Sequence, residues 1–266
     1  MSAANGEKGA ANSPDHRNAR DLVIVPSAAA LASAAAERVV AAASAAIRAR
    51  GRFVVALAGG STPKALYTLL ASTPVSPRID WSRVDVFWGD ERCCPPDDPG
   101  SNYRMTREVL LDRVAIPPEQ VHRIRGEDDP VLAATSYERQ LRTVFPSTSR
   151  FDLVLLGMGD NGHTASLFPG LSAVRELTRW VTAEYVPEVS MWRVTLTPAA
   201  INAAAAVLFL VAGAGKAAML ARVLEGPRVP DELPAQSIAP TDGSLTWLVD
   251  AAAAAQLKRE EPERLT

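Results

Sequence analysis

The stretch FDLVLLGMGDNGHTASLFPG, residues Phe151–Gly170, joins a largely apolar run to a glycine-rich loop. Such a run, in which polar and apolar residues do not alternate, predicts a strand buried on both faces, as in a parallel sheet. The loop opens with G-x-G-x-x-G, the pattern of a dinucleotide-binding turn, and Glu184 lies near the distance of that motif's acidic residue. After Gly162, however, only HTASLF remains for a helix before Pro169, and a crossover helix is normally longer. The context therefore argues against NAD.

Similar apolar runs lie on both sides of this one and alternate with helical patterns. We expect strands at 21–25, 53–59, 84–91, 121–124, 151–157, 192–197, 205–213 and 244–250, and helices at 28–49, 63–71, 101–114, 129–145 and 215–224. This alternation predicts β-α-β units and a single α/β domain over 21–258, with a mostly parallel, Rossmann-like sheet and helices on both faces. The polar segments 1–20 and 259–266 are expected to be tails, the first of them disordered.

Composition limits the classes of function. The 266 residues carry a net charge of −2, which gives no reason to expect nucleic acid or an anionic membrane surface as a partner. Cys93 and Cys94 are adjacent in the sequence, which disfavours a disulfide between them. Two neighbouring thiols also do not have the ligand spacing of a zinc site. The N-terminus lacks the apolar core of a signal peptide, and the Ala-rich helix 28–49 contains charged residues, so it is not expected to span a membrane. We expect a cytoplasmic protein that is a monomer or a weak homo-oligomer.

In open parallel sheets, ligands bind beyond the carboxyl ends of the strands. The first such end leads into Gly60, Ser61 and Thr62, where the glycine allows close backbone approach and Thr62 is a candidate helix cap. Free N–H groups at a helix start attract phosphate. Lys216 lies at the start of a later helix, where it opposes the helix dipole and would serve better as an anion ligand.

A second strand end carries the charged triplet Asp90, Glu91 and Arg92. The Arg92 guanidinium is a planar fork suited to phosphate or carboxylate, and Asp90 is placed to orient a base or a sugar hydroxyl. Asn102 begins the next helix, where it either contributes to the site or acts as a cap.

His163 follows the glycine-rich loop at the same mouth of the sheet. We expect a neutral imidazole there, because a helix N-terminus disfavours imidazolium, and a neutral imidazole is what a general base requires. Asp160 is close enough in sequence to orient it. No second histidine has the spacing of a metal ligand, and neither a G-x-S-x-G elbow nor a histidine-paired cysteine pattern occurs. These groups together favour hydrolysis or isomerisation of a small phosphorylated molecule without a metal or covalent intermediate.

The motifs GGSTPKALY, FWGDERCCPPDDPGSNYRM, LLGMGDNGHTASLFPG, RVTLT, GAGKAAM and LPAQ, in this order, resemble the 6-phosphogluconolactonase family from about Val23 to Asp250. The resemblance implies a fold shared with glucosamine-6-phosphate deaminase and ribose-5-phosphate isomerase. It also implies hydrolysis of 6-phospho-D-glucono-1,5-lactone to 6-phosphogluconate in the oxidative pentose phosphate pathway, without a metal or organic cofactor.

Residue roles follow from the resemblance. His163 would be the base, and the phosphate-binding residues would be Gly60, Ser61, Thr62, Arg92 and Lys216. Separately from the resemblance, we expect loop N–H groups of Gly159, Asn161 and Gly162, or Arg92, to stabilise the oxyanion. The family often has Asp immediately before the Gly-His pair, where this chain has Asn161, so either Asp160 supplies the carboxylate or none is needed.

Two alternatives stay open at this point. A glucosamine-6-phosphate deaminase resembles the chain in GGSTP and in the Asp-Glu and Gly-His pairs. It has Glu-Pro where this chain has Phe168-Pro169, and typically a tyrosine in place of Arg92. A non-catalytic sugar-phosphate sensor is the second alternative. Such a module usually adjoins a DNA-binding segment, for which the N-terminal segment lacks length and basic helices.

Overall fold

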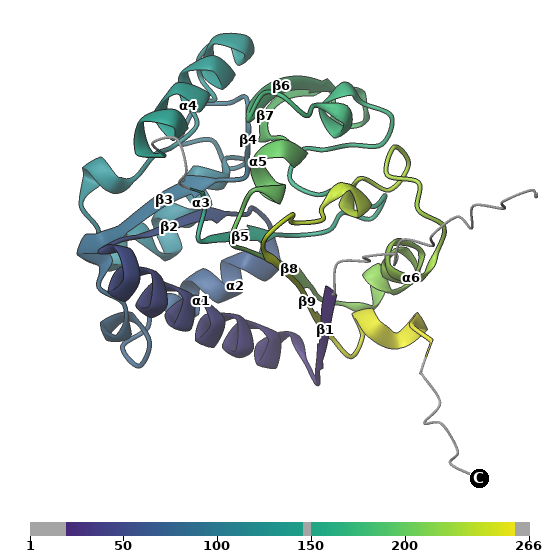
Figure 1. Ribbon diagram of the computed structural model, residues 1–266, viewed down its shortest axis with the longest axis horizontal. Coiled ribbons are helices and arrows are strands. Elements are labelled where there is room, and N and C mark those ends of the chain that lie inside the picture. The colour runs from purple at the N-terminus through teal and green to yellow at the C-terminus, as the bar shows by residue number, and fades with distance from the viewer. Residues whose placement is uncertain (1–19, 146–149, 259–266) are drawn as a thin grey trace, which may run out of the picture.

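The continuous apolar runs form a six-stranded parallel sheet (Figure 1). The computed structural model describes residues 20–145 and 150–258. The strands lie in the order β1-β9-β8-β5-β2-β3, with β1 at Arg20–Val25, β2 at Phe53–Leu57, β3 at Val84–Trp88, β5 at Leu153–Leu156, β8 at Ala206–Val211 and β9 at Ser244–Asp250. Every residue of β2 and β5 is buried, as the absence of alternation predicted. The chain passes from β2 to β3 and later returns to β5 on the other side of β2, which creates a topological switch point between β2 and β5.

A second, antiparallel sheet was not predicted. It has the order β4-β7-β6, formed by Asp90–Arg92, Met191–Leu196 and Val181–Val186, respectively. The expected strand 84–91 therefore divides at Gly89. The N–H of Gly89 donates to the carbonyl of Leu57 (2.8 Å) in the parallel sheet, and its carbonyl accepts from the N–H of Leu196 (2.7 Å) in the antiparallel one. This junction turns Asp90 and Arg92 away from the central sheet.

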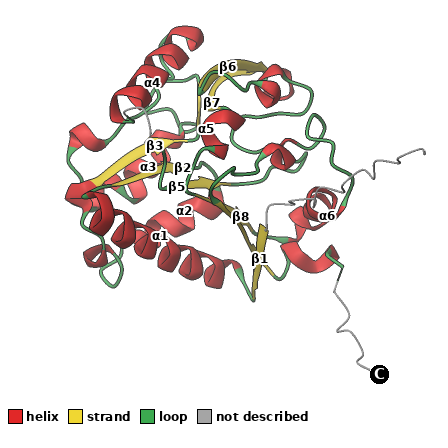
Figure 2. Cartoon of the chain, viewed as in Figure 1, coloured by secondary structure: helices red, strands yellow, loops and turns green. Residues whose placement is uncertain are grey.

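Helices cover both sides of the central sheet, which confirms the predicted fold class (Figure 2). Helices α1 and α2 lie along one side, whereas α4, α5 and the antiparallel sheet lie on the other (Figure 1). The helices span Ala28–Arg50 (α1), Ser61–Leu70 (α2), Asn102–Val109 (α3), Pro130–Val144 (α4), Pro198–Asn202 (α5) and Ala217–Glu225 (α6). Ser27 caps α1 by accepting from the N–H of Ala30 (3.2 Å), and Gly51 ends the helix with a φ of 76°.

Within the described chain, α1 is the one helix long and apolar enough to cross a membrane by length and composition. Its buried residues, among them Leu31, Ala35 and Val39, belong to the hydrophobic core, and α1 contacts β2 and β9. The helix therefore has the place in the fold that the sequence predicted, as a helix packed on the sheet.

Several local expectations were wrong or fall outside the described residues. The expected strand 121–124 is reduced to an isolated bridge between Val121 and Val86, and neither β6 nor α5 was predicted. Arg20, assigned to the tail, is the first residue of β1, where it pairs with Leu245. The rest of the expected N-terminal tail and all of 259–266 lie outside the described residues.

Three buried side chains fix the strand ends from which the site loops start. The Tyr67 hydroxyl donates to the carbonyl of Ala58 and accepts from its N–H, both at 2.8 Å, so α2 is tied to the end of β2. The Tyr137 hydroxyl makes the same pair of bonds with Trp88, tying α4 to the end of β3. The Asp250 carboxylate accepts from the N–H of Gly213 (3.0 Å), which begins the loop to Lys216. The site loops are thus held by the core.

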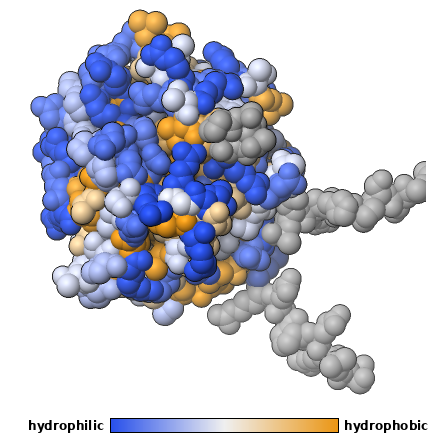
Figure 3. Space-filling model, turned by 60° about the vertical axis from the view of Figure 1, so that its left-hand side comes forward, coloured by the Kyte–Doolittle hydropathy of each residue, from blue (hydrophilic) through white to orange (hydrophobic). Residues whose placement is uncertain are grey.

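Hydrophobic residues that remain exposed are spread over several elements. The face seen in Figure 3 is mostly hydrophilic, with smaller hydrophobic areas between the hydrophilic ones. The exposed large hydrophobic residues are Leu22 and Ile24 on β1, Val131 and Leu132 on α4, Leu177, and Tyr185, Val189 and Trp192 on the β6–β7 hairpin.

The two cysteines are free and directly follow β4. The N–H of Cys93 donates to the carbonyl of Trp192 (3.0 Å), and both thiols are half-buried. Burial raises the pKa of each thiol to about 11. Because only the thiolate is nucleophilic, about 0.1% of each thiol would be reactive near pH 8, against about a quarter of an ordinary cysteine. We expect alkylation by iodoacetamide to be about 10²-fold slower in the folded protein than in urea, as measured by mass spectrometry. Equal alkylation rates in the folded protein and in urea would contradict the raised pKa of the two thiols.

Candidate active site

The loop after β5 carries His163 but does not continue into a helix. Gly162, with a φ of 81°, and Ala165, with a φ of 47°, both adopt left-handed backbone conformations that interrupt helical geometry. The Thr164 hydroxyl donates to the carbonyl of Gly157 (2.8 Å) and closes the loop on itself. The helix N-terminus that we expected beside His163 is therefore not formed. Because no crossover helix follows the glycine-rich loop, the structure argues against a dinucleotide-binding turn more strongly than the sequence did.

Glycine is required at position 159 by the His163 ring. A Cβ at Gly159 would lie 2.1 Å from Nδ1 and Cε1 of His163. The ring stacks on Phe168, with 4.1 Å between centroids and 21° between planes. The imidazole ring is thus held between the backbone of Gly159 and the ring of Phe168.

Asn161 determines which nitrogen of His163 carries the proton. Its Oδ1 lies 2.6 Å from Nδ1 of His163, and its Nδ2 donates to Oε2 of Glu188 at 2.7 Å. Because a carboxylate only accepts, this network assigns Oδ1 of Asn161 as the acceptor for the histidine. Nδ1 therefore carries hydrogen, and Nε2 keeps its lone pair. Among the residues the structure describes, none forms a hydrogen bond with Nε2.

Burial is the main electrostatic influence on His163. It lowers the pKa of the imidazole below its ordinary value of 6.5, and the positive charges of Lys216 and Arg193 act in the same direction. The carboxylates of Asp90 and Glu188 oppose this shift. The lowered pKa favours the neutral imidazole that we expected, but the cause of the shift is desolvation and not a helix dipole.

Asp160 does not orient the histidine. Its Oδ1 forms an ion pair with Nζ of Lys216 at 2.5 Å, and the same bond lowers the pKa of the Asp160 carboxyl. Adjacent side chains of this turn are thus used separately, since Asn161 contacts the imidazole and Asp160 the lysine. Lys216 is at the N-cap of α6, one residue before the helix, and is mostly buried beside the more exposed Asp160.

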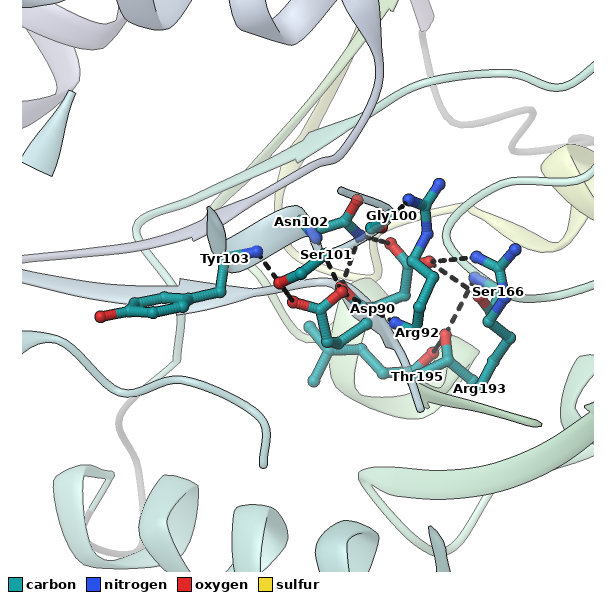
Figure 4. Close-up of polar contacts among 11 residues, drawn as sticks. Asp90, Arg92, Gly100, Ser101, Asn102, Tyr103, Ser166, Arg193 and Thr195 are labelled. Carbon is teal, nitrogen blue, oxygen red and sulfur yellow. Dashed lines mark hydrogen bonds and ion pairs between the residues drawn. The ribbon is translucent and has the colours of Figure 1, made fainter. Parts of the chain in front are cut away.

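Asp90 is buried among polar groups at the junction of the two sheets (Figure 4). Its Oδ2 accepts from the Ser166 hydroxyl at 2.7 Å, which connects β4 to the His163 loop. Nδ2 of Asn102 donates to the carbonyl of Asp90 at 2.9 Å. The amide of Asn102 also packs so closely on Gly59 that a Cβ there would lie 2.0 Å from its Oδ1. Asn102 therefore joins two site loops; the N-cap of α3 is Ser101.

Arg193 is a site residue that the sequence analysis missed. It lies on β7, is 9% exposed, and its Nη1 is 3.9 Å from Oδ2 of Asp90. Arg92 lies opposite it in the β4–β7 ladder and donates from Nη1 to the carbonyl of Gly100. Figure 4 shows both arginines, with the guanidinium of Arg193 directed toward Asp90 and that of Arg92 toward Gly100. A charged residue in the apolar run WRVTLT was the available signal.

The two arginines leave hydrogen-bonding capacity unused. Within the described part of the chain, Nε of Arg92 and Nε of Arg193 are the buried side-chain nitrogens that lack a partner. Buried polar groups are normally satisfied, so an unused pair beside one another indicates an anion site. Burial lowers the pKa of Arg193, and the nearby positive charge of Arg92 acts in the same direction.

Gly60, Ser61 and Thr62 form the start of α2. Gly60 is the N-cap, with a φ of 102°, and no side chain caps the helix, so the expected Thr62 cap was wrong. Ser61 is exposed and Thr62 half-buried. Uncapped N–H groups at a helix start are suited to bind an anion.

Two expected oxyanion donors are already used. The N–H of Gly159 donates to the carbonyl of His163 (2.8 Å), and that of Gly162 donates to the carbonyl of Gly159 (3.1 Å). The Asn161 side chain is committed to His163 and Glu188. Donation by Gly159 and Gly162 is therefore not supported, donation by the backbone N–H of Asn161 stays a prediction, and the arginines are further candidates. In residues 20–145 and 150–258, no group of three or more His, Cys, Asp or Glu side chains is placed to hold a metal ion.

Comparison with known proteins identifies the family. The profile of the family "Glucosamine-6-phosphate isomerases/6-phosphogluconolactonase" matches residues 26–247. The chain belongs to this family. Relatives in the glucosamine-6-phosphate isomerase/6-phosphogluconolactonase family include the 6-phosphogluconolactonase of Nostoc sp., 45% identical over 80% of this chain and 88% of the relative. That of Haemophilus influenzae is 39% identical over 75% and 85%, respectively. The structure of 6-phosphogluconolactonase from Trypanosoma cruzi superposes with a TM-score of 0.79 at 29% identity, covering 91% of this chain and 98% of the other.

Proposed function

We propose that the protein hydrolyses 6-phospho-D-glucono-1,5-lactone to 6-phosphogluconate, as a cytoplasmic enzyme of the oxidative pentose phosphate pathway. The names of its relatives support this activity. The observation that carries the proposal is the tautomer of His163 that Asn161 selects, because its Nε2 lone pair is available and the positive charges of Lys216 and Arg193 act on the ring. The proposed partner is the phosphorylated sugar lactone alone, with no cofactor.

Substrate binding would depend on the cationic groups and on the start of α2. Lys216, Arg92 and the turn at Ser61–Thr62 hold the phosphate in this proposal. Arg193, unpartnered at Nε, adds a donor to Arg92 for the anion or for the developing oxyanion. Holding the remote phosphate positions the lactone carbonyl beside His163 and reduces the entropic cost of reaction.

The chemical step uses one base. Nε2 of His163 takes a proton from water as the water oxygen bonds to C1 of the lactone. The tetrahedral intermediate then collapses, the bond from C1 to the ring oxygen breaks, and the imidazolium returns its proton to that oxygen. The product acid ionises and releases one proton to solvent. A lactone is an activated ester, so this limited set of groups is chemically sufficient.

The alternatives have less support. In a deaminase the residue after the Gly-His loop would be an acid-base glutamate, whereas here Phe168 stacks on the histidine and contributes no proton. A sensor would not require Nε2 of His163 to be unprotonated and unpartnered.

The test is a coupled assay with freshly generated lactone. 6-Phosphogluconate formation is followed with 6-phosphogluconate dehydrogenase and compared with spontaneous hydrolysis. Unphosphorylated gluconolactone is the matched substrate, and we expect it to react far more slowly because the cationic groups are then unused. Ammonia release from glucosamine 6-phosphate, or product binding without turnover, would replace the proposal by one of the alternatives.

The pH dependence follows from the lowered pKa of His163. A base is active when deprotonated, so kcat/KM should rise with pH and reach its plateau at a pH below that expected for an ordinary histidine of pKa 6.5. Charged groups that influence this value are Asp90, Glu188, Lys216 and Arg193. The profile is measured between about pH 4.5 and 8, after subtraction of spontaneous hydrolysis. An acidic limb of kcat/KM with its midpoint above the ordinary histidine pKa of 6.5 would contradict the assignment of His163 as the base.

A further inference from the structure

We propose that Glu188 is a positioning residue for the His163 base, and that it acts through Asn161. Glu188 lies in the turn between β6 and β7, 27 residues after Asn161 in the sequence. It makes one contact there, accepting from Nδ2 of Asn161 at 2.7 Å. The expected loss of kcat rests on the proposed function, whereas the expected effect on the tautomer of His163 does not.

An asparagine side chain can form hydrogen bonds in either of two orientations. The side chain of Asn161 presents an acceptor on one side and a donor on the other, and rotation by 180° exchanges them. With Oδ1 toward the histidine, Nδ1 of His163 must donate, which leaves Nε2 as the base. With Nδ2 toward the histidine, Nδ1 must accept, Nε2 carries the hydrogen, and the base is lost. An aspartate at this position would have no such ambiguity.

Glu188 resolves this ambiguity. A carboxylate can accept but not donate, so it selects the orientation in which Nδ2 of Asn161 faces it. The N–H of His163 adds to the same preference by donating to Oδ1 of Asn161 at 3.1 Å. The negative charge that an aspartate would place beside the imidazole is thus moved outward by one hydrogen bond. From there it still favours the protonated ring that forms during the reaction.

The first test measures the tautomer directly. Nitrogen-15 NMR of the free protein distinguishes protonated from unprotonated ring nitrogens of His163. We expect the Nδ1–H form in the wild type and a mixture in Glu188→Ala, with kcat lowered about tenfold, the lower range for outer partners that orient an active group. Glu37→Ala, which removes an exposed carboxylate paired with Arg78, is the matched control and should change neither quantity.

The second test exchanges the two polar groups. Asn161→Asp alone places two carboxylates at hydrogen-bond distance and should lower kcat. The double variant Asn161→Asp, Glu188→Gln restores one donor and one acceptor in reversed positions, and we expect kcat within about threefold of wild type, with the acidic limb of the pH profile moved upward by the adjacent carboxylate. Additive losses in the double variant would overturn the proposal.

The two proposals fail differently. A wild-type tautomer and wild-type kcat in Glu188→Ala would overturn the role of Glu188 while leaving lactone hydrolysis intact. A changed tautomer in a protein without lactonase activity would support the role of Glu188 and reject the proposed function.

Discussion

Replacing His163 with alanine is expected to lower kcat by about 10²–10⁴-fold, the usual contribution of a general base. The reason is that Nε2 of this ring is the one nitrogen in the proposed site whose protonation state is fixed for accepting a proton. Binding of 6-phosphogluconate should remain within about threefold of wild type, because the arginines, Lys216 and the start of α2 are unchanged. Turnover is measured in the coupled assay and product binding by calorimetry.

The chain offers a matched control for this substitution. His122 is also half-buried, stacks on Phe87 with 4.3 Å between centroids, and lies 2.9 Å from Oδ1 of Asp85. His122→Ala therefore removes a comparable stack and hydrogen bond outside the site, and kcat should be retained even if the protein is less stable. A His163→Ala enzyme as fast as the wild type, or an equal loss in both variants, would remove the base from the mechanism.

The sequence predicted those features that depend on short-range pattern. The fully buried strands at 53–57 and 153–156 lie within the predicted ranges 53–59 and 151–157, because no polar residue interrupts either strand. The position of His163 followed from the rule that ligands bind at strand ends. The antiparallel sheet was missed because the division at Gly89 depends on hydrogen bonds to Leu57 and Leu196, which the local sequence does not specify.

The site residues that were not predicted from the sequence contact partners that are far from them along the chain. Glu188 contacts Asn161 from 27 residues away, and Ser166 contacts Asp90 from 76. The choice between Asp160 and Asn161 as the partner of the histidine was a different kind of problem. Both are close enough, and only the folded turn, with Lys216 placed beside Asp160, decides between them.

Substituting alanine for Gly159 is expected to reduce kcat nearly as much as removing the imidazole. The added methyl group would lie 2.1 Å from two atoms of the His163 ring, so the ring must leave its place between the loop backbone and Phe168. Displacement breaks the 2.6 Å contact to Asn161 and with it the control of the tautomer. Since efficient catalysis requires reacting groups at hydrogen-bond distance, we expect a loss of about 10²-fold or more.

Gly157→Ala is the control for this prediction because it lies in the same loop and a Cβ there would meet no atom within 4 Å. Neither Gly157 nor Gly159 has a positive φ, so backbone strain does not distinguish the two substitutions. The Gly157 variant should retain kcat and the Nδ1–H tautomer of His163, whereas the Gly159 variant should lose both while keeping its circular dichroism spectrum and its affinity for 6-phosphogluconate. Equal activity of the two variants would show that the ring can move without consequence, and the geometric basis of the proposed mechanism would then be wrong.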